Sequence, residues 1–183
     1  MTLTFDQTFS ADEVSPLPPP ALISALVPSA GRFNEGLFSV LDHSLSTQVL
    51  RSWRWLLGQD AIALVASSVG DLFFWSEKYS GIYFLEVQRG SSTFVGTDLE
   101  WFFTNFITVG EILDEVLHRP LFVSLCDRLQ PPRYGECFIA EPWQRLGGSG
   151  AVDTYEKGSL DVYTNLLGQA VEIAMTAERA RRR

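Results

Sequence analysis

Apolar residues in the middle of the chain occur in short runs that are separated by turn-forming residues. These runs span 61–67, 72–75, 82–87 and 92–95. Gly70, Gly81 and Gly90 lie between them. Short runs rich in β-branched and aromatic residues, with glycine turns between them, predict strands in an antiparallel meander. The apolar run 36–41 predicts one more strand upstream.

Apolar positions three and four residues apart predict helices on both sides of the meander. One apolar stripe starts near Ser44, and Gly58 ends it. A second stripe follows residue 97, where Thr97 and Glu100 have the spacing of a capping box, with Thr97 accepting from the backbone N–H of Glu100. A third segment starts near Gly110, is interrupted before Pro120, and continues to Leu129.

The last third of the chain predicts a strand over 134–140, a turn over 146–150 and a final helix from about Ser159. Gly147 and Gly148 lack the spacing of a phosphate-binding loop, so we expect them to form a turn with positive φ. The fold class is α+β, with a central, mostly antiparallel sheet and packed helices. The expected organisation is an extended proline-rich lead-in (1–20), a main region (21–120), a C-terminal region packed on it (121–176) and a basic tail (177–183).

The composition is that of a globular protein, because 46% of the 183 residues are hydrophobic and 20% are charged. No run of 18 apolar residues and no signal-peptide pattern is present, so we expect a cytoplasmic protein that does not bind a membrane. Cys126 and Cys137 are too few for a disulfide framework and are expected to be apolar fillers in a reducing compartment.

The net negative charge of the chain comes from its first two thirds. The net charge is -8, and residues 1–120, with 14 acids and 6 bases, account for all of it. This charge disfavours direct nucleic-acid binding and favours a basic partner. The arginines at 179 and 181–183 are interpreted as a solvated helix end that suits the negative helix dipole.

The residue types that bind metals or carry nucleophilic catalysis show no recognisable spacing. His43, His118, Cys126 and Cys137 contain no zinc-binding pair, and no nucleophile elbow is present. His118 is placed near a helix end, where its charged form would suit the dipole. We therefore expect no catalytic residues, no metal and no cofactor.

Two short segments place acids beside aromatic residues outside the apolar stripes. Glu77 and Tyr79 fall in a meander loop, and Asp98, Glu100 and Trp101 fall at a helix start. Exposed aromatic residues bordered by acids have the composition of a partner-binding surface, although a solvated rim is the alternative interpretation.

The motifs of the C-terminal third resemble a known domain. These are Tyr134-Gly-Glu-Cys-Phe138, Leu146-Gly147-Gly148, Tyr155-Glu156-Lys157, Asp161-Val162-Tyr163 and Leu166-Leu167-Gly168-Gln169. They resemble the C-terminal domain of the type VI secretion immunity proteins that protect bacteria from a DNase effector. Upstream, Gly36-Leu37-Phe38, the Trp53 helix and Gly70 to Trp75 resemble the GAD-like domain that precedes it, a pattern also typical of SMI1/KNR4 immunity folds.

The resemblance implies a non-enzymatic inhibitor that binds a cognate toxin, a nuclease effector, as a monomer or small oligomer. Two other classes stay open from the residues alone. A nucleic-acid-binding regulator would use Arg51, Arg54 and the basic tail, and a small hydrolase would use a pocket near His43 or His118.

Overall fold

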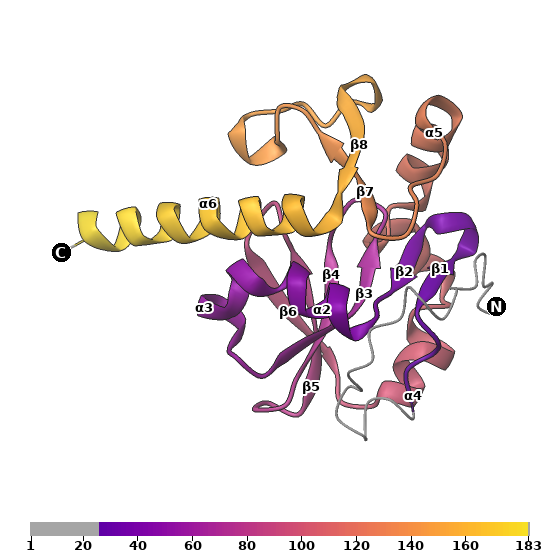
Figure 1. Cartoon of the computed structure of the whole chain (residues 1–183), viewed down its shortest axis with the longest axis horizontal. Coiled ribbons are helices and arrows are strands. Elements are labelled where there is room, and N and C mark those ends of the chain that lie inside the picture. The colour runs from indigo at the N-terminus through magenta and orange to yellow at the C-terminus, as the bar shows by residue number, and fades with distance from the viewer. Residues whose placement is uncertain (1–25, 183) are drawn as a thin grey trace.

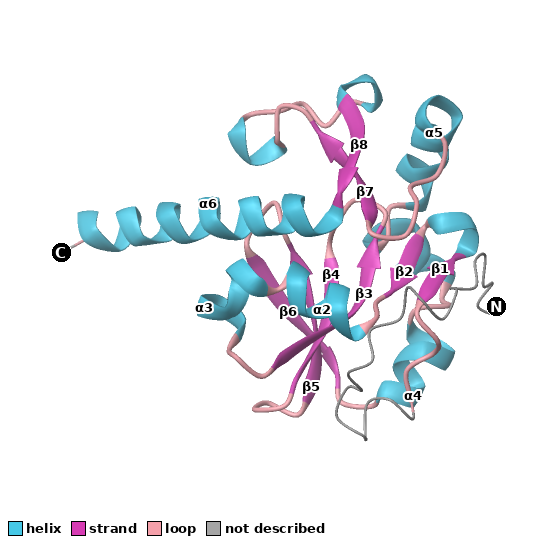
Figure 2. Ribbon diagram, in the orientation of Figure 1, coloured by secondary structure: helices cyan, strands magenta, loops and turns pink. Residues whose placement is uncertain are grey.

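The structure is a computed structural model, in which residues 26–182 are described; the proline-rich lead-in lies outside them. Its centre is a six-stranded antiparallel sheet with the strands in sequence order (Figures 1 and 2). The strands are β1 (Gly31–Phe33), β2 (Phe38–Val40), β3 (Ala61–Ser67), β4 (Leu72–Ser76), β5 (Gly81–Glu86) and β6 (Ser91–Gly96). The α+β class and the meander are confirmed. The short strand β1 was not predicted.

Successive side chains of the central strands enter two separate cores. Phe73 and Ile82 belong to one core, whereas Leu72 and Leu85 belong to the other. This alternation is the two-residue period of a strand, and it explains why β3 to β5 are apolar throughout rather than at every second position. The sheet is therefore covered on both faces.

One face is covered by α2 (His43–Val49), the 3-10 helix η3 (Arg51–Trp53), α3 (Arg54–Leu57) and the long C-terminal helix α6 (Leu160–Arg181). The single helix predicted from Ser44 to Gly58 is divided. Asn165 of α6 inserts its side-chain amide at the division, where it donates to Gln48 O (2.8 Å) and accepts from Ser52 N (2.9 Å). These two backbone groups would otherwise bond to each other in an α-helix, so the inserted amide breaks the ladder.

The other face is covered by α4 (Leu99–Trp101), the π-helices η4 (Phe102–Phe106) and η5 (Ile112–Val116), and α5 (Arg119–Leu129). Helices were predicted here, and the interruption before Pro120 is present. The predicted capping box is wrong: Asp98 is the N-cap, and its side chain accepts from Trp101 N at 2.9 Å. A carboxylate one residue closer to the first free N–H groups replaces the Thr97 hydroxyl.

A two-stranded hairpin forms a second, smaller sheet from β7 (Glu136–Ala140) and β8 (Tyr155–Ser159). Its strands are connected through η6 (Gln144–Leu146) and η7 (Val152–Thr154), and η2 (Asn34–Gly36) joins β1 to β2. β7 begins two residues later than predicted, and β8 was missed because four of its five residues, Gly158 among them, are exposed or half-buried. The hairpin contacts the main sheet where Phe138 N donates to Ser68 O at 2.7 Å.

The two ends of the main sheet differ in what lies beyond them. At one, the covered end, the β3–β4 turn (68–71) and the β5–β6 turn (87–90) face β7, β8 and α6 (Figure 1). At the other, the open end, are the β4–β5 turn (77–80) and the connection from β6 to α4 (97–98). The candidate sites described below lie at these two ends.

Candidate functional site

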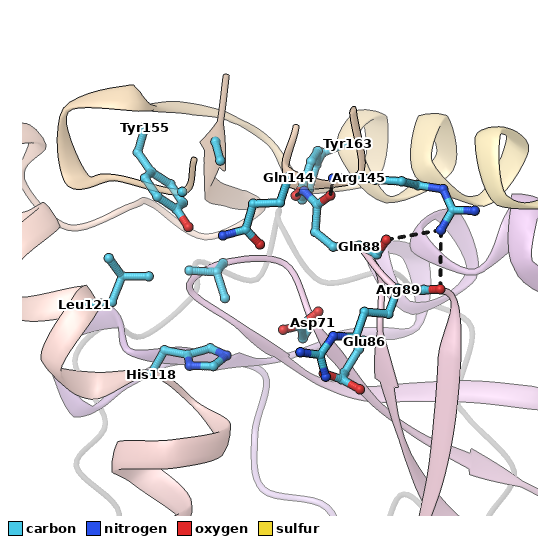
Figure 3. A pocket seen from close by; sticks show the side chains of 13 residues that line it. Asp71, Glu86, Gln88, Arg89, His118, Leu121, Gln144, Arg145, Tyr155 and Tyr163 are labelled. Carbon is cyan, nitrogen blue, oxygen red and sulfur yellow. Dashed lines mark hydrogen bonds and ion pairs between the residues drawn. The ribbon is translucent and has the colours of Figure 1, made fainter. Parts of the chain in front are cut away.

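A pocket of about 440 Å³ lies at the covered end, between the two turns and the C-terminal hairpin (Figure 3). Its polar lining comes from six separate segments: Asp71, Glu86, Gln88, Arg89, His118, Gln144, Arg145, Tyr155 and Tyr163. Its volume lies within the range of small-molecule sites. From this set only His118 was considered as a functional residue on the sequence alone, whereas Tyr155 and Tyr163 were named only as members of the C-terminal motifs.

Asp71 lies at the base of the pocket, in the turn that ends at β4. Its side chain is 9% exposed, and Oδ1 accepts a hydrogen bond from Val87 N at 2.9 Å. The turn itself is tied by Ser67, whose hydroxyl accepts from Asp71 N at 3.0 Å. Burial raises the pKa of Asp71, the hydrogen bond from Val87 N lowers it, and the charges of Glu86 and Arg89 raise and lower it respectively; the resulting pKa is about 7.

The two tyrosines of the pocket come from the C-terminal segment. Tyr163 of α6 is bonded to Gln88, whose side-chain amide donates to the phenol oxygen. Tyr155, at the start of β8, is 5% exposed, and Figure 3 shows its hydroxyl directed into the cavity. Burial raises the pKa of both phenols, so both keep their protons at neutral pH.

His118 stands at the opposite side of the pocket, in the left-handed conformation (φ 55°) that separates η5 from α5. It follows the C-cap of η5, so the predicted position near a helix end is confirmed. It is also the N-cap residue of α5, and a cation is disfavoured at that helix N-terminus. Burial lowers the pKa of His118, which keeps the imidazole neutral at pH 7.

The five predicted partner-binding residues all lie at the open end. Glu77 and Tyr79 are in the β4–β5 turn, while Asp98, Glu100 and Trp101 begin the helix after β6. The antiparallel pairing of Ile82 with Gly96 brings these two segments to the same end of the sheet.

The open end also exposes aromatic surface. Tyr79 is 61% exposed and Trp101 is 41% exposed. Tyr79 packs on Tyr83 (6.4 Å between ring centroids), and Tyr83 packs on Phe94 of β6 (5.5 Å). Trp101 packs instead on Phe106 (5.4 Å), on the opposite face of the sheet.

Two residues at the open end were not singled out from the sequence. Phe94 is 56% exposed on the edge strand β6. Asp60, just before β3, accepts hydrogen bonds from Lys78 N (2.8 Å) and the Ser76 hydroxyl (3.0 Å). The hydrogen bond from Lys78 N lowers the pKa of Asp60, so this side chain is ionised at neutral pH. With Glu77, Asp98 and Glu100, it is the fourth carboxylate at the open end.

Gly147 and Gly148 lie in the loop above the pocket. Gly147 has a φ of 90°, the left-handed region that favours glycine. Gly148 has an ordinary φ, and a Cβ there would overlap the carbonyl oxygen of Pro142.

Both cysteines are free thiols. Cys137 is buried and Cys126 is half-buried, and burial raises the pKa of the Cys126 thiol to about 11.

Comparisons with known proteins place the fold. The Agrobacterium tumefaciens protein Atu4351, known from a crystal structure, is similar over 82% of this chain and 79% of its own, with a TM-score of 0.57 and 16% identity. At this identity the likeness shows the fold alone. No protein-family model and no curated protein matches the chain.

Two further features are absent from residues 26–182. No helix among them is both long and apolar enough to cross a membrane. The same residues contain no group of three or more His, Cys, Asp or Glu side chains that could hold a metal ion.

Proposed function

We propose that this protein is a cytoplasmic immunity protein that binds and neutralises a cognate bacterial toxin, a type VI secretion nuclease effector. The proposal starts from the resemblance of the C-terminal motifs and of the upstream GAD-like pattern. The observation that carries it is the open end, where two acidic and aromatic segments of the chain lie together.

The open end has the chemistry that a basic nuclease surface requires. Glu77, Asp98 and Glu100 are exposed, so they attract a basic partner during encounter without a cost of desolvation in the free protein. Tyr79, Phe94 and Trp101 supply aromatic area of the kind that anchors interfaces. A DNA-cleaving toxin must itself carry a basic surface, and covering it would keep the toxin from its substrate.

The edge strand β6 offers a further mode of attachment. All of β6 from Ser91 to Phe94 is exposed, and β6 pairs only with β5 among the described strands. Its outward backbone groups can therefore pair with a strand of the partner, as in β-strand addition.

The test is the rate of association with the toxin encoded beside this protein. Raising the salt from about 50 to about 500 mM should slow association about tenfold or more while changing dissociation less, because salt screens the encounter. Trp101→Ala should weaken binding by about 2 kcal/mol if Trp101 is an anchor.

A matched control is Trp143→Ala, since Trp143 is a half-buried tryptophan at the covered end. It should leave toxin affinity unchanged. Association that is insensitive to salt, together with equal affinities for the two variants and the natural chain, would overturn the proposal.

A further inference from the structure

Two mostly buried residues each present to the pocket at the covered end a polar atom that has no hydrogen bond within residues 26–182. The Tyr155 hydroxyl makes no hydrogen bond within residues 26–182, although its side chain is only 5% exposed. Asp71 uses Oδ1 for Val87 N, and its second carboxylate oxygen accepts no bond from the same residues. Neither atom is among the fully buried atoms without a partner, so both are open to the cavity and available to a ligand there.

The carboxylate of Asp71 also lacks a counter-ion. Arg89 is the nearest compensating charge, but its Nη1 is paired with Glu86 Oε1 at 2.8 Å. Arg145 is directed at the carbonyl oxygens of Gln88 and Arg89, at 3.3 and 3.4 Å. The lining carries two acids and two arginines in all, but Asp71 itself makes no ion pair within residues 26–182.

We infer that this pocket binds a small organic cation, whose ammonium or guanidinium group donates hydrogen bonds to Asp71 Oδ2 and to the Tyr155 hydroxyl oxygen. The cation would form the direct ion pair that Asp71 lacks, and its N–H groups would donate to both open acceptors. Gln144, which Figure 3 shows extending into the cavity from the loop above, is placed to bond the rest of the ligand. This inference does not rest on the proposed toxin binding, which uses the other end of the sheet.

The charge state of the pocket predicts the pH dependence of binding. The titratable and charged groups around Asp71 are Glu86 at the end of β5, Arg89 in the turn after it, His118 before α5, Cys137 on β7, Arg145 on η6, Tyr155 on β8 and Tyr163 on α6. With a pKa of about 7, Asp71 is mostly protonated at pH 6 and mostly ionised at pH 8. A cation binds the ionised form, so its affinity should rise about tenfold over this range.

The experiment compares two probes of equal length, 1,5-diaminopentane and 1,5-pentanediol, by calorimetry and by NMR of the Val87 and Tyr155 amides; agmatine adds a guanidinium. The two cations should bind at least tenfold more tightly than the diol. Asp71→Asn should weaken them at least tenfold and remove the pH dependence, while Tyr155→Phe should weaken them about threefold or more. Asn keeps an acceptor for Val87 N, so Asp71→Asn is expected to fold.

Two controls separate binding in the pocket from binding elsewhere on the protein. Asp153→Asn removes an exposed acid of η7 and should change nothing. His118→Gln removes the imidazole that lines the same pocket and should keep most of the pH dependence.

The inference fails if the diol binds as tightly as the diamine, if Asp71→Asn retains full affinity, or if neither cation binds. Its failure is distinguishable from that of the proposed function, because Asp71→Asn should leave toxin association unchanged. Loss of toxin binding in Asp71→Asn, without diamine binding to the natural chain, would assign the pocket to a protein side chain and overturn the small-molecule inference.

Discussion

The covered and open ends of the sheet are built from the same meander and differ only in what packs against them. At the covered end, Gly70 lies so close to α6 that a Cβ there would be 2.8 Å from Tyr163 Cε1. At the open end, the whole turn from Glu77 to Ser80 is exposed. One set of turns therefore closes a polar pocket, and the other presents an acidic and aromatic surface.

This difference suits the two ends of the sheet to the two different kinds of binding proposed for them. A pocket needs walls from several segments, which only a second layer of structure supplies. A protein-binding surface needs exposed anchors on a rigid frame, and the turns of a meander supply them without any cover. Changes at one end should accordingly leave the other end unaffected.

The largest expected effect comes from the tryptophan that fastens α6 over the sheet. Trp53 is fully buried, and its Nε1 donates to Thr164 O at 2.8 Å. Trp53→Ala should lower the free energy of unfolding by about 3 to 5 kcal/mol, measured by urea denaturation, because it leaves a large cavity and an open carbonyl.

Trp101→Ala is the matched change at the open end. Trp101 is 41% exposed, so its loss should lower the free energy of unfolding by about 1 kcal/mol or less. Equal losses for the two variants would contradict the distinction between a packed and an exposed end.

The fold was largely predictable because its signals are local. The runs that form β3 to β6 are contiguous, and Gly58 and Pro120 mark where helices end or restart. The division of the first helix was not predictable, because Asn165 lies more than one hundred residues away from Ser52. A tertiary hydrogen bond here overrides a continuous apolar stripe.

The two sites differ in the same way. Glu77 and Tyr79, like Asp98 and Trp101, are close in sequence, so their composition could be recognised from the amino-acid sequence alone. Asp71 and Tyr155 are brought together only by the packing of the hairpin on the sheet. The only feature of the sequence near the pocket that could have indicated it is Asp71, an acid between two apolar runs. Such a position is informative because burying a carboxylate is costly unless it has a partner.

The contribution of Asp71 to the stability of the covered end should depend on pH. The pKa of this carboxyl is raised in the fold from 3.8 to about 7, so the folded state binds the extra proton. Its contribution to stability is fully present at pH values below the unfolded pKa and is lost as pH rises through about 7. Asp71→Asn should therefore raise the free energy of unfolding by about 1 to 3 kcal/mol at pH 8 and by less at pH 5.

Urea denaturation at the two pH values, compared between the variant and the natural chain, cancels the other titrating groups. A variant that is less stable than the natural chain at pH 8 would contradict this account. A variant that is more stable but no longer binds the diamine would show that the Asp71 carboxylate lowers the stability of the fold and is needed for ligand binding.

A smaller effect is expected in the loop above the pocket. Gly147→Ala places a side chain at a φ of 90°, with open space around the new Cβ, so only backbone strain should count. The free energy of unfolding should fall by about 1 kcal/mol. Gly110→Ala, which also meets open space but has no positive φ, should cost nothing. Similar losses of unfolding free energy for Gly147→Ala and Gly110→Ala would contradict the requirement for positive φ at Gly147.

The smallest effect on stability is expected at the open end. Neutralising Glu77, Asp98 and Glu100 as Gln, Asn and Gln should change the free energy of unfolding by less than about 0.5 kcal/mol, since the acids are exposed and Asn keeps the helix cap. The same triple variant should slow association with the toxin about threefold or more, measured by stopped-flow fluorescence, because these charges steer the encounter.

A second triple variant with the same change in net charge tests where the attraction originates. Neutralising Glu141, Asp153 and Glu172, three exposed acids outside the open end, should slow association less than about twofold, since a charge far from the interface is screened within about 10 Å of solution. If both triple variants slow association equally, the attraction belongs to the net charge of the whole chain, and the open end loses its claim to be the interface. If only the first does so, the acids of the two turns act locally, and the toxin docks where the sheet is uncovered.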